Sequence, residues 1–303
     1  MCFRNAFDRL LSPVIIRIGS KFMKLLIFNT QGSHYFRREI LIFVKKKTTL
    51  KVYFLGTGTS QGIPVIGSDH PVCLSRDIKD KRLRVSALLS WDDQAYAIDC
   101  GPDFRQQMLA AGCRKLDGIL FTHEHADHTA GLDDIRPFNF RQGDMPIYAH
   151  KRVIESLKRR FDYIFETENR YPGAPSVAVT EVEKNSPFEI GGKKVIPVNA
   201  WHADLQVFGY RIDDFAYLTD VKTIDPEEIE KLKGLKVLVV NALRIEPHIS
   251  HFNLDEALAF IKLIQPERAY LTHISHHMGF HDEVQQNLPE NVFLAYDNLE
   301  IVI

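Results

Sequence analysis

The run HEHADH at positions 123–128 constrains this 303-residue chain more than any other feature of its sequence. It follows the short apolar run 118–121 after a single residue, Thr122, and such a run is typical of a buried strand. Its donors therefore sit in a strand-to-helix turn and can converge on one point; they are His123, His125, Asp127 and His128. Four donors within six residues are more than one tetrahedral zinc ion takes from a single turn, so the sequence predicts two metal ions. A polar turn that is merely rich in histidine is the competing interpretation.

The 13 histidines of the chain are clustered along the sequence. Histidines used only for packing would be scattered, whereas metal sites gather them. Nine of them fall in four short stretches of the sequence: His123, His125 and His128; His202 alone; His248 and His251; and His273, His276 and His277. This clustering favours a metal-binding protein.

A strand followed by His-x-His-x-Asp-His resembles the signature of the metallo-β-lactamase superfamily. Four further motifs of that superfamily are matched in order by Asp99, His202, Asp220 and His273, each at the end of an expected strand. Taken alone, His202 could be an ordinary histidine and Asp220 a simple turn residue, but their order and context favour the resemblance.

The resemblance implies a role for each matched residue. Asp99 is expected to accept a hydrogen bond from a ligand histidine and to fix its tautomer. Asp127 and Asp220 are expected to serve catalysis through two divalent ions, zinc or manganese. The implied ligand sets are His123, His125 and His202 for one ion, Asp127, His128 and His273 for the other, and Asp220 as the bridge between both.

The superfamily does not by itself choose a substrate, because thioesters, lactones, β-lactams and phosphodiesters are all cleaved on this fold. The stretch from Ser250 to Ala257 resembles the His-x-x-x-x-Glu-Ala element of ribonuclease Z and of phosphoribosyl cyclic phosphate phosphodiesterases. In those enzymes the histidine is a general acid, which implies that role for His251. The alternative is that His251 only caps the helix that begins near Asn253.

The glycine-rich stretch 55–64 resembles the opening loop of the phosphodiesterase branch. After this loop, the cyclic phosphodiesterases often carry three cysteines that form a structural zinc site with a late histidine. Here Ser68 and His70 replace two of the cysteines, while Cys73 and His276 remain. His70, Cys73 and His276 could hold a third zinc ion, or the loop could be held by hydrogen bonds without metal. Arg136 and His277 are candidate phosphate contacts, and each could equally be structural.

Short apolar runs alternate with amphipathic stretches from Lys51 onward, and the resemblance implies a mixed α/β fold, a four-layer αββα sandwich. Strands are expected at 51–55, 87–90, 95–98, 118–121, 195–198, 215–218, 237–240, 269–272 and 292–295. Helices are expected at 102–112, 151–165, 225–233 and 253–265. We assign residues 50–303 to the catalytic domain.

Residues 1–49 differ from the rest: they are basic and patchily apolar, and they end in three lysines at 45–47. No apolar run reaches the roughly 18 to 20 residues of a membrane span, and no apolar core is followed by a small-residue cleavage site. Three interpretations stay open: a basic membrane-surface segment, a terminal extension of the fold, or a start codon assigned too early. We favour the last of these and expect an N-terminal extension, residues 1–49, that does not belong to the native fold.

The composition, with 45% hydrophobic residues, 25% charged residues and a net charge of −1, gives no global basic field. Tight non-specific binding to long nucleic acid is therefore not expected. The cysteines have neither the density nor the spacing of a disulfide framework, which favours the cytoplasm; they are Cys2, Cys73, Cys100 and Cys113. The sequence leaves the oligomeric state open and is compatible with a homodimer.

Together these features predict a phosphodiesterase for a small cyclic phosphate or related ester, using a hydroxide activated by two metals and His251 as general acid. The alternatives are a ribonuclease Z-like endonuclease and another hydrolase of the superfamily acting on a lactone or thioester. The long arm with which ribonuclease Z grips transfer RNA would have to lie in 151–190. That stretch is basic but reads as a short helix followed by strands, without the glycine and proline of such an arm.

Overall fold

The computed structural model describes residues 13–18, 22–28, 37–43, 48–168 and 170–303. The chain divides into two compact units, Met1–Thr48 and Thr49–Ile303. In the first unit, strands β1 (Pro13–Ile18), β2 (Phe22–Phe28) and β3 (Arg37–Phe43) pair in that order as an antiparallel sheet. Cys2 and the three lysines at 45–47 lie outside the described residues.

Deleting residues 1–49 is expected to leave a protein that folds and binds metal like the full chain. The unit boundary falls at Thr49, and Leu50 already belongs to the second unit: it is 2% exposed, and its carbonyl accepts a hydrogen bond from Ile303 N at 2.9 Å. Thermal denaturation and metal analysis of the shortened protein check this. An insoluble or metal-free product would make the segment part of the fold.

The second unit contains two seven-stranded mixed sheets. The first runs β17-β4-β5-β6-β7-β8-β9, with β4 Lys51–Gly56, β5 Ser86–Trp91, β6 Gln94–Ile98, β7 Gly118–Leu120, β8 Met145–Ala149, β9 Val177–Glu181 and β17 Glu300–Val302. The second runs β10-β11-β12-β13-β14-β15-β16, with β10 Phe188–Ile190, β11 Lys193–His202, β12 Leu205–Ile212, β13 Phe215–Tyr217, β14 Val237–Asn241, β15 Arg268–Thr272 and β16 Val292–Leu294.

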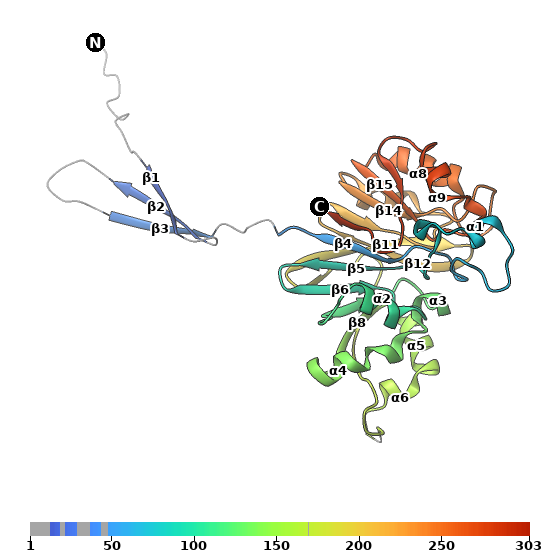
Figure 1. Cartoon of the computed structure of the whole chain (residues 1–303). Coiled ribbons are helices and arrows are strands. Elements are labelled where there is room, and N and C mark those ends of the chain that lie inside the picture. The colour runs from blue at the N-terminus through green and yellow to red at the C-terminus, as the bar shows by residue number, and fades with distance from the viewer. Residues whose placement is uncertain (1–12, 19–21, 29–36, 44–47, 169) are drawn as a thin grey trace, which may run out of the picture. The chain divides into compact units, whose positions relative to one another are not determined.

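Helices cover the outer faces of both sheets (Figure 1). The α-helices are α1 Pro71–Leu74, α2 Phe104–Ala110, α3 Ala126–Thr129, α4 Arg136–Gln142, α5 Lys151–Arg160, α6 Asp162–Phe165, α7 Pro226–Ile229, α8 Leu254–Ile264 and α9 His281–Gln285. Short 3₁₀ helices are η1 Ile78–Asp80, η2 Leu132–Ile135, η3 Glu230–Leu232 and η4 His276–Met278. Figure 1 shows α2, α4 and α5 beside the first sheet and α8 and α9 beside the second.

Buried apolar side chains fill the spaces between these layers. Phe54 and Tyr210 belong to the core between the two sheets, and Leu157 of α5 packs in the core that covers the first sheet. Phe260 of α8 packs in the core that covers the second sheet. The mixed α/β class and the four-layer order predicted from the sequence are therefore confirmed.

The strand directions decide where the polar motifs meet. Strands β6 to β9 are parallel to one another, as are β13 to β16. Parallel strands present their carboxyl ends at one edge of a sheet, where ligand sites form in open α/β folds. Asp99 follows β6, His123 follows β7, Asp220 follows β13 and His273 follows β15. These residues therefore lie at matching edges of the two sheets.

Two predicted helices are interrupted. The helix expected at 151–165 breaks at Phe161, whose φ of −132° leaves the helical range, and continues as α6. The helix expected at 225–233 becomes the single turn α7 followed by η3. Strands β1 to β3, β8, β12 and β17 are additional to those expected, whereas β9 and β10 are the strands expected after the helix in 151–190.

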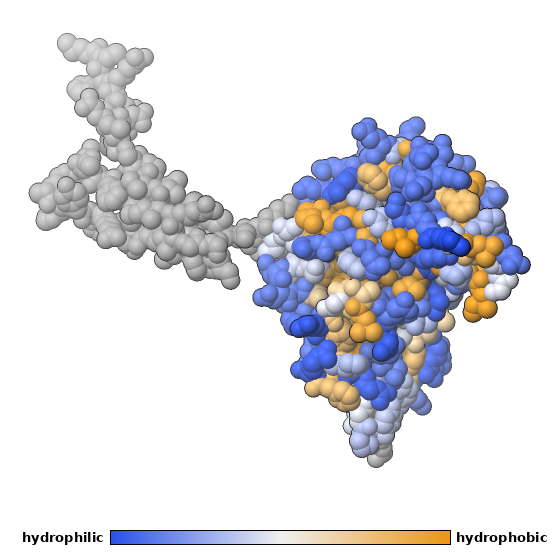
Figure 2. All heavy atoms as spheres, viewed as in Figure 1, coloured by the Kyte–Doolittle hydropathy of each residue, from blue (hydrophilic) through white to orange (hydrophobic). Residues whose placement is uncertain are grey.

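The face of the second unit in Figure 2 is largely hydrophilic, with smaller apolar areas between polar ones. Within the described part of the chain, no helix combines the length and apolar character needed to cross a membrane.

Candidate metal centre

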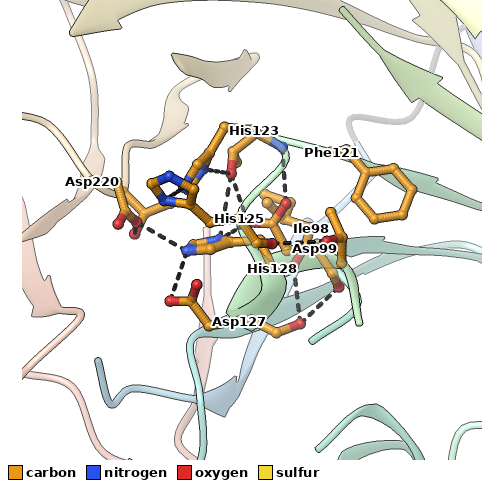
Figure 3. Close-up of polar contacts among 12 residues, drawn as sticks. Ile98, Asp99, Phe121, His123, His125, Asp127, His128 and Asp220 are labelled. Carbon is orange, nitrogen blue, oxygen red and sulfur yellow. Dashed lines mark hydrogen bonds and ion pairs between the residues drawn. The ribbon is translucent and has the colours of Figure 1, made fainter. Parts of the chain in front are cut away.

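The first group of site residues comes from the ligand turn, residues 123–128, which follows β7 and includes the first residues of the short helix α3. His123 and His128 are completely buried, whereas His125 is exposed. His123 Nε2 lies 3.0 Å from His125 Nδ1, and Asp127 Oδ2 lies 3.3 Å from His128 Nε2. Figure 3 shows the carboxylates of Asp127 and Asp220 both directed toward the His128 ring. One short turn thus gathers the four donors that the sequence singled out.

The second group comes from three strand ends of the other sheet. Asp220 presents one carboxylate oxygen to each neighbour: Oδ2 is 3.2 Å from His128 Nε2, and Oδ1 is 3.2 Å from His273 Nε2. The His202 ring centre lies 5.3 Å from that of His125. The structure therefore brings all seven sequence-predicted ligand residues together, with Asp220 between the two groups.

Three site residues have a left-handed backbone. Asp99, Asp220 and His273 have φ angles of 64°, 60° and 55°. This region is sparsely populated by residues other than glycine, and such strain persists where the surroundings determine the conformation, often at functional sites. The conformation sets how these side chains leave their strand ends.

Asp99 lies beside His128 and Thr122. Its Oδ2 is 2.7 Å from His128 Nδ1, and its two oxygens accept hydrogen bonds from the backbone N–H and hydroxyl of Thr122, each at 2.8 Å. With Nδ1 of His128 donating to Asp99, its Nε2 faces Asp127 and Asp220. The role of Thr122 as a hydrogen-bond donor to Asp99 was not predicted from the sequence. Its position directly before His123 was the only sequence feature that pointed to it.

Gly101, two residues after Asp99, lies where two segments of the chain approach each other closely. The loop after β6 bonds to the ligand turn, with Cys100 N donating to His128 O at 2.7 Å. A Cβ atom on Gly101 would lie 2.1 Å from the carbonyl oxygen of Asp127, closer than real contacts allow. Only glycine lets the loop approach the turn this closely.

The electrostatics of the group fit cations. Burial lowers the pKa of His123 well below its ordinary value, which leaves a neutral imidazole able to offer a lone pair. Burial would also lower the pKa of His128, but Asp220, Asp127 and Asp99 together raise it well above its ordinary value. For Asp220, His273 and His128 outweigh burial and hold the pKa well below its ordinary value. A cation bound here would take the place of the proton on His128.

Buried nitrogen atoms without a suitable partner point the same way. His128 Nε2 and His273 Nε2 are buried and lack a hydrogen bond of acceptable geometry. Burying a polar atom without a hydrogen-bond partner costs free energy of folding, unless the atom binds a ligand such as a metal ion. Among the described residues, three sets have ligand atoms within 4.8 Å of one another: His123, His128 and Asp220; Asp127, His128 and His273; and His202, Asp220 and His251. The residues present thus fit divalent metal ions.

His251 borders the group and is 8% exposed. Its ring centre lies 4.4 Å from that of His202 and 4.8 Å from that of His273, and its Nδ1 is 3.7 Å from Asp220 Oδ1. Burial lowers the pKa of His251 to about 2. The helix cap that follows is made by Asn253, whose side chain accepts from Glu256 N in a capping box. His251 is therefore not the cap of α8.

The other candidate residues lie elsewhere. Arg136 donates to Asp133 Oδ1, the Tyr171 hydroxyl and Gly173 O, so its guanidinium holds a neighbouring loop. His277 is exposed, and its ring centre lies 4.0 Å from that of His276.

The proposed third zinc site is only partly assembled. His276 packs 4.9 Å from His70, ring centre to ring centre. Cys73 Sγ instead accepts a hydrogen bond from Val65 N, and His70 Nδ1 accepts from Val72 N. Among the described residues, His70, Cys73 and His276 are not a set whose ligand atoms approach one another. A third zinc ion stays a prediction.

Comparison with known proteins now identifies the fold family. Residues 95–274 match the model of the beta-lactamase superfamily domain. The chain belongs to the metallo-β-lactamase superfamily. Within this superfamily, a diphosphatase of the PhnP family is 38% identical in sequence, with a TM-score of 0.79 over 84% of this chain and 97% of that one. The chain is thus a PhnP-family protein with the fold of a metal-dependent hydrolase.

Two curated relatives share only part of their length with this PhnP-family chain. An octanoyltransferase from Porphyromonas gingivalis is 41% identical over 256 residues, which are 84% of this chain and 52% of the relative. A ribonuclease Z from Bacillus subtilis is 27% identical over 170 residues, which are 54% of this chain and 49% of the relative. The chain therefore spans only about half the length of each of these relatives.

Proposed function

We propose that this PhnP-family chain hydrolyses phosphodiesters of small molecules with two divalent ions, zinc or manganese, and with His251 as general acid. The observation that carries the proposal is the place of His251. It is nearly buried beside His202, His273 and Asp220, and α8 has its own cap in Asn253. Because His251 lies against the ligand residues and does not cap α8, its side chain is available to the substrate.

The residues that would hold the ions are those of the sequence-predicted set: His123, His125 and His202; Asp127, His128 and His273; and Asp220 between them. Two bound divalent ions supply a water of lowered pKa and neutralise charge on phosphoryl oxygens. Asp99 keeps the His128 ring oriented through the 2.7 Å contact at Nδ1.

His251 would protonate the departing ester oxygen. Because an alkoxide leaves poorly, this proton transfer typically contributes about 10²- to 10⁴-fold. Burial lowers the pKa of His251, so the ring is protonated only if a nearby negative charge raises that pKa. The negative charge of a phosphodiester bound beside the ring acts in the opposite direction and raises that pKa.

A ribonuclease Z-like activity is the second candidate, favoured by the sequence similarity to ribonuclease Z and by the basic end of α5. Against it, the described residues of 151–190 form helices α5 and α6 and strands β9 and β10, where the sequence predicted a short helix followed by strands, and not the long arm expected for gripping transfer RNA. A small substrate therefore fits this chain better.

A substrate panel tests the proposal. Purified protein supplied with Mn²⁺ or Zn²⁺ is expected to hydrolyse bis(p-nitrophenyl) phosphate faster than a p-nitrophenyl thioester or an aromatic lactone. Precursor transfer RNA is the fourth member of the panel. Faster cleavage of the RNA would favour the endonuclease, and a preference for the thioester or lactone would refute the phosphodiesterase.

A further inference from the structure

The candidate metal centre is built from two halves of the fold. His123, His125, Asp127 and His128 come from the first sheet, whereas His202, Asp220 and His273 come from the second. An ion shared between the halves needs their spacing to be fixed within a few tenths of an ångström. The contacts that join the halves near His125 and His202 are therefore of interest.

Helix α5 contacts the ligand turn from both of its ends. In its first turn, Arg152 Nε donates to Glu124 Oε1 at 2.7 Å. In its last turn, Arg160 Nη2 donates to the carbonyl oxygen of Glu124 at 3.0 Å and to Thr129 Oγ1 at 2.8 Å. Thr129 Oγ1 in turn donates to His125 O at 2.8 Å. The residue next to His125 is thus held by its side chain and by its backbone.

Arg152 also reaches the other sheet. Its Nη2 donates to the carbonyl oxygen of Gln206 in β12. Gln206 stands opposite Trp201 in the β11–β12 ladder, and the next pair is Leu205 opposite His202. One guanidinium therefore touches a neighbour of His125 on one side and the hairpin that carries His202 on the other.

We propose that Arg152 is a positioning residue that fixes the distance between His125 and His202, and with it the affinity for the ion these histidines would share with His123. This inference rests on the ligand sets of the proposed function. The planar guanidinium can donate in two directions at once, which a lysine ammonium on a flexible stem does less well. The Arg152 and Glu124 side chains are 34% and 19% exposed, so the pair is expected to act through geometry more than through stability.

The test is a titration of the metal-free protein with Zn²⁺ in competition with a chromophoric chelator, without substrate. Arg152→Ala is expected to weaken one of the two stepwise affinities by roughly 10-fold or more, as outer-shell changes typically do, and to leave the other unchanged. The weakened constant should be the one that His202→Ala also weakens. The unfolding temperature should change little.

Two further variants sharpen the result. Glu124→Gln keeps the side-chain size and should weaken the same constant, and the double variant should be no worse than the more affected single variant. Arg159→Ala, an exposed position on the same helix, is the matched control and should bind both ions normally. Unchanged constants in Arg152→Ala, an equal fall in both constants, or additive effects of the two single variants would each overturn the inference. A wild-type protein that binds fewer than two ions would instead refute the proposed function.

Discussion

Replacing Asp220 with alanine is expected to lower the occupancy of both metal ions, from about two per chain toward none, and to abolish hydrolysis. The reason is geometric. Asp220 Oδ2 lies 3.2 Å from His128 Nε2, and Asp220 Oδ1 lies 3.2 Å from His273 Nε2. Its carboxylate is 2% exposed and held in its charged form by these histidines. Metal analysis after dialysis against metal-free buffer measures the occupancy.

The matched control for this variant is Asp93→Ala, which also removes one carboxylate, at an exposed turn position. It should keep both ions. If Asp220→Ala retained one ion at full occupancy, Asp220 would serve a single site, and the bridging role would be wrong.

His251→Ala is expected to slow an alkyl phosphodiester on the order of 10²-fold or more, with a much smaller loss on bis(p-nitrophenyl) phosphate. A general acid matters in proportion to how poorly the leaving group departs, and p-nitrophenolate leaves without a proton. Steady-state kinetics with both substrates measure the two losses, and metal analysis should find both ions still bound.

Two other outcomes would change the role of His251. Equal losses on both substrates with both ions bound would make it a positioning residue for the substrate. Loss of an ion in His251→Ala would make His251 a metal ligand. The ligand atoms of His202, Asp220 and His251 lie within 4.8 Å of one another, close enough for that role.

The ligand turn could be predicted from the sequence because its donors are local. HEHADH needs only a strand before it and a helical turn at its end, and the structure provides β7 and α3, which begins at Ala126. The long-range partners Asp220 and His273 could be placed only through a family resemblance. Nothing in their local sequence shows that β13 and β15 end beside β7.

Other parts of the site depend on packing that the sequence pattern does not show. Strand β12 (Leu205–Ile212) carries Gly209 in its middle, and glycine weakens a strand pattern. In the fold a Cβ at this position would lie 2.8 Å from the backbone carbonyl oxygen of Tyr217 and 2.1 Å from Leu218 Cδ2, so the close packing favours glycine. Arg152 likewise reads as one of several basic residues on a helix until its contacts with Glu124 and Gln206 are seen.

One measurement tests the central claim most directly: hydrolysis of bis(p-nitrophenyl) phosphate by metal-free protein as Mn²⁺ or Zn²⁺ is added in steps. The two-ion account predicts that activity continues to rise beyond the first equivalent and levels off at about two ions per chain. Full activity at one ion per chain, or no phosphodiester hydrolysis with two ions bound, would contradict it.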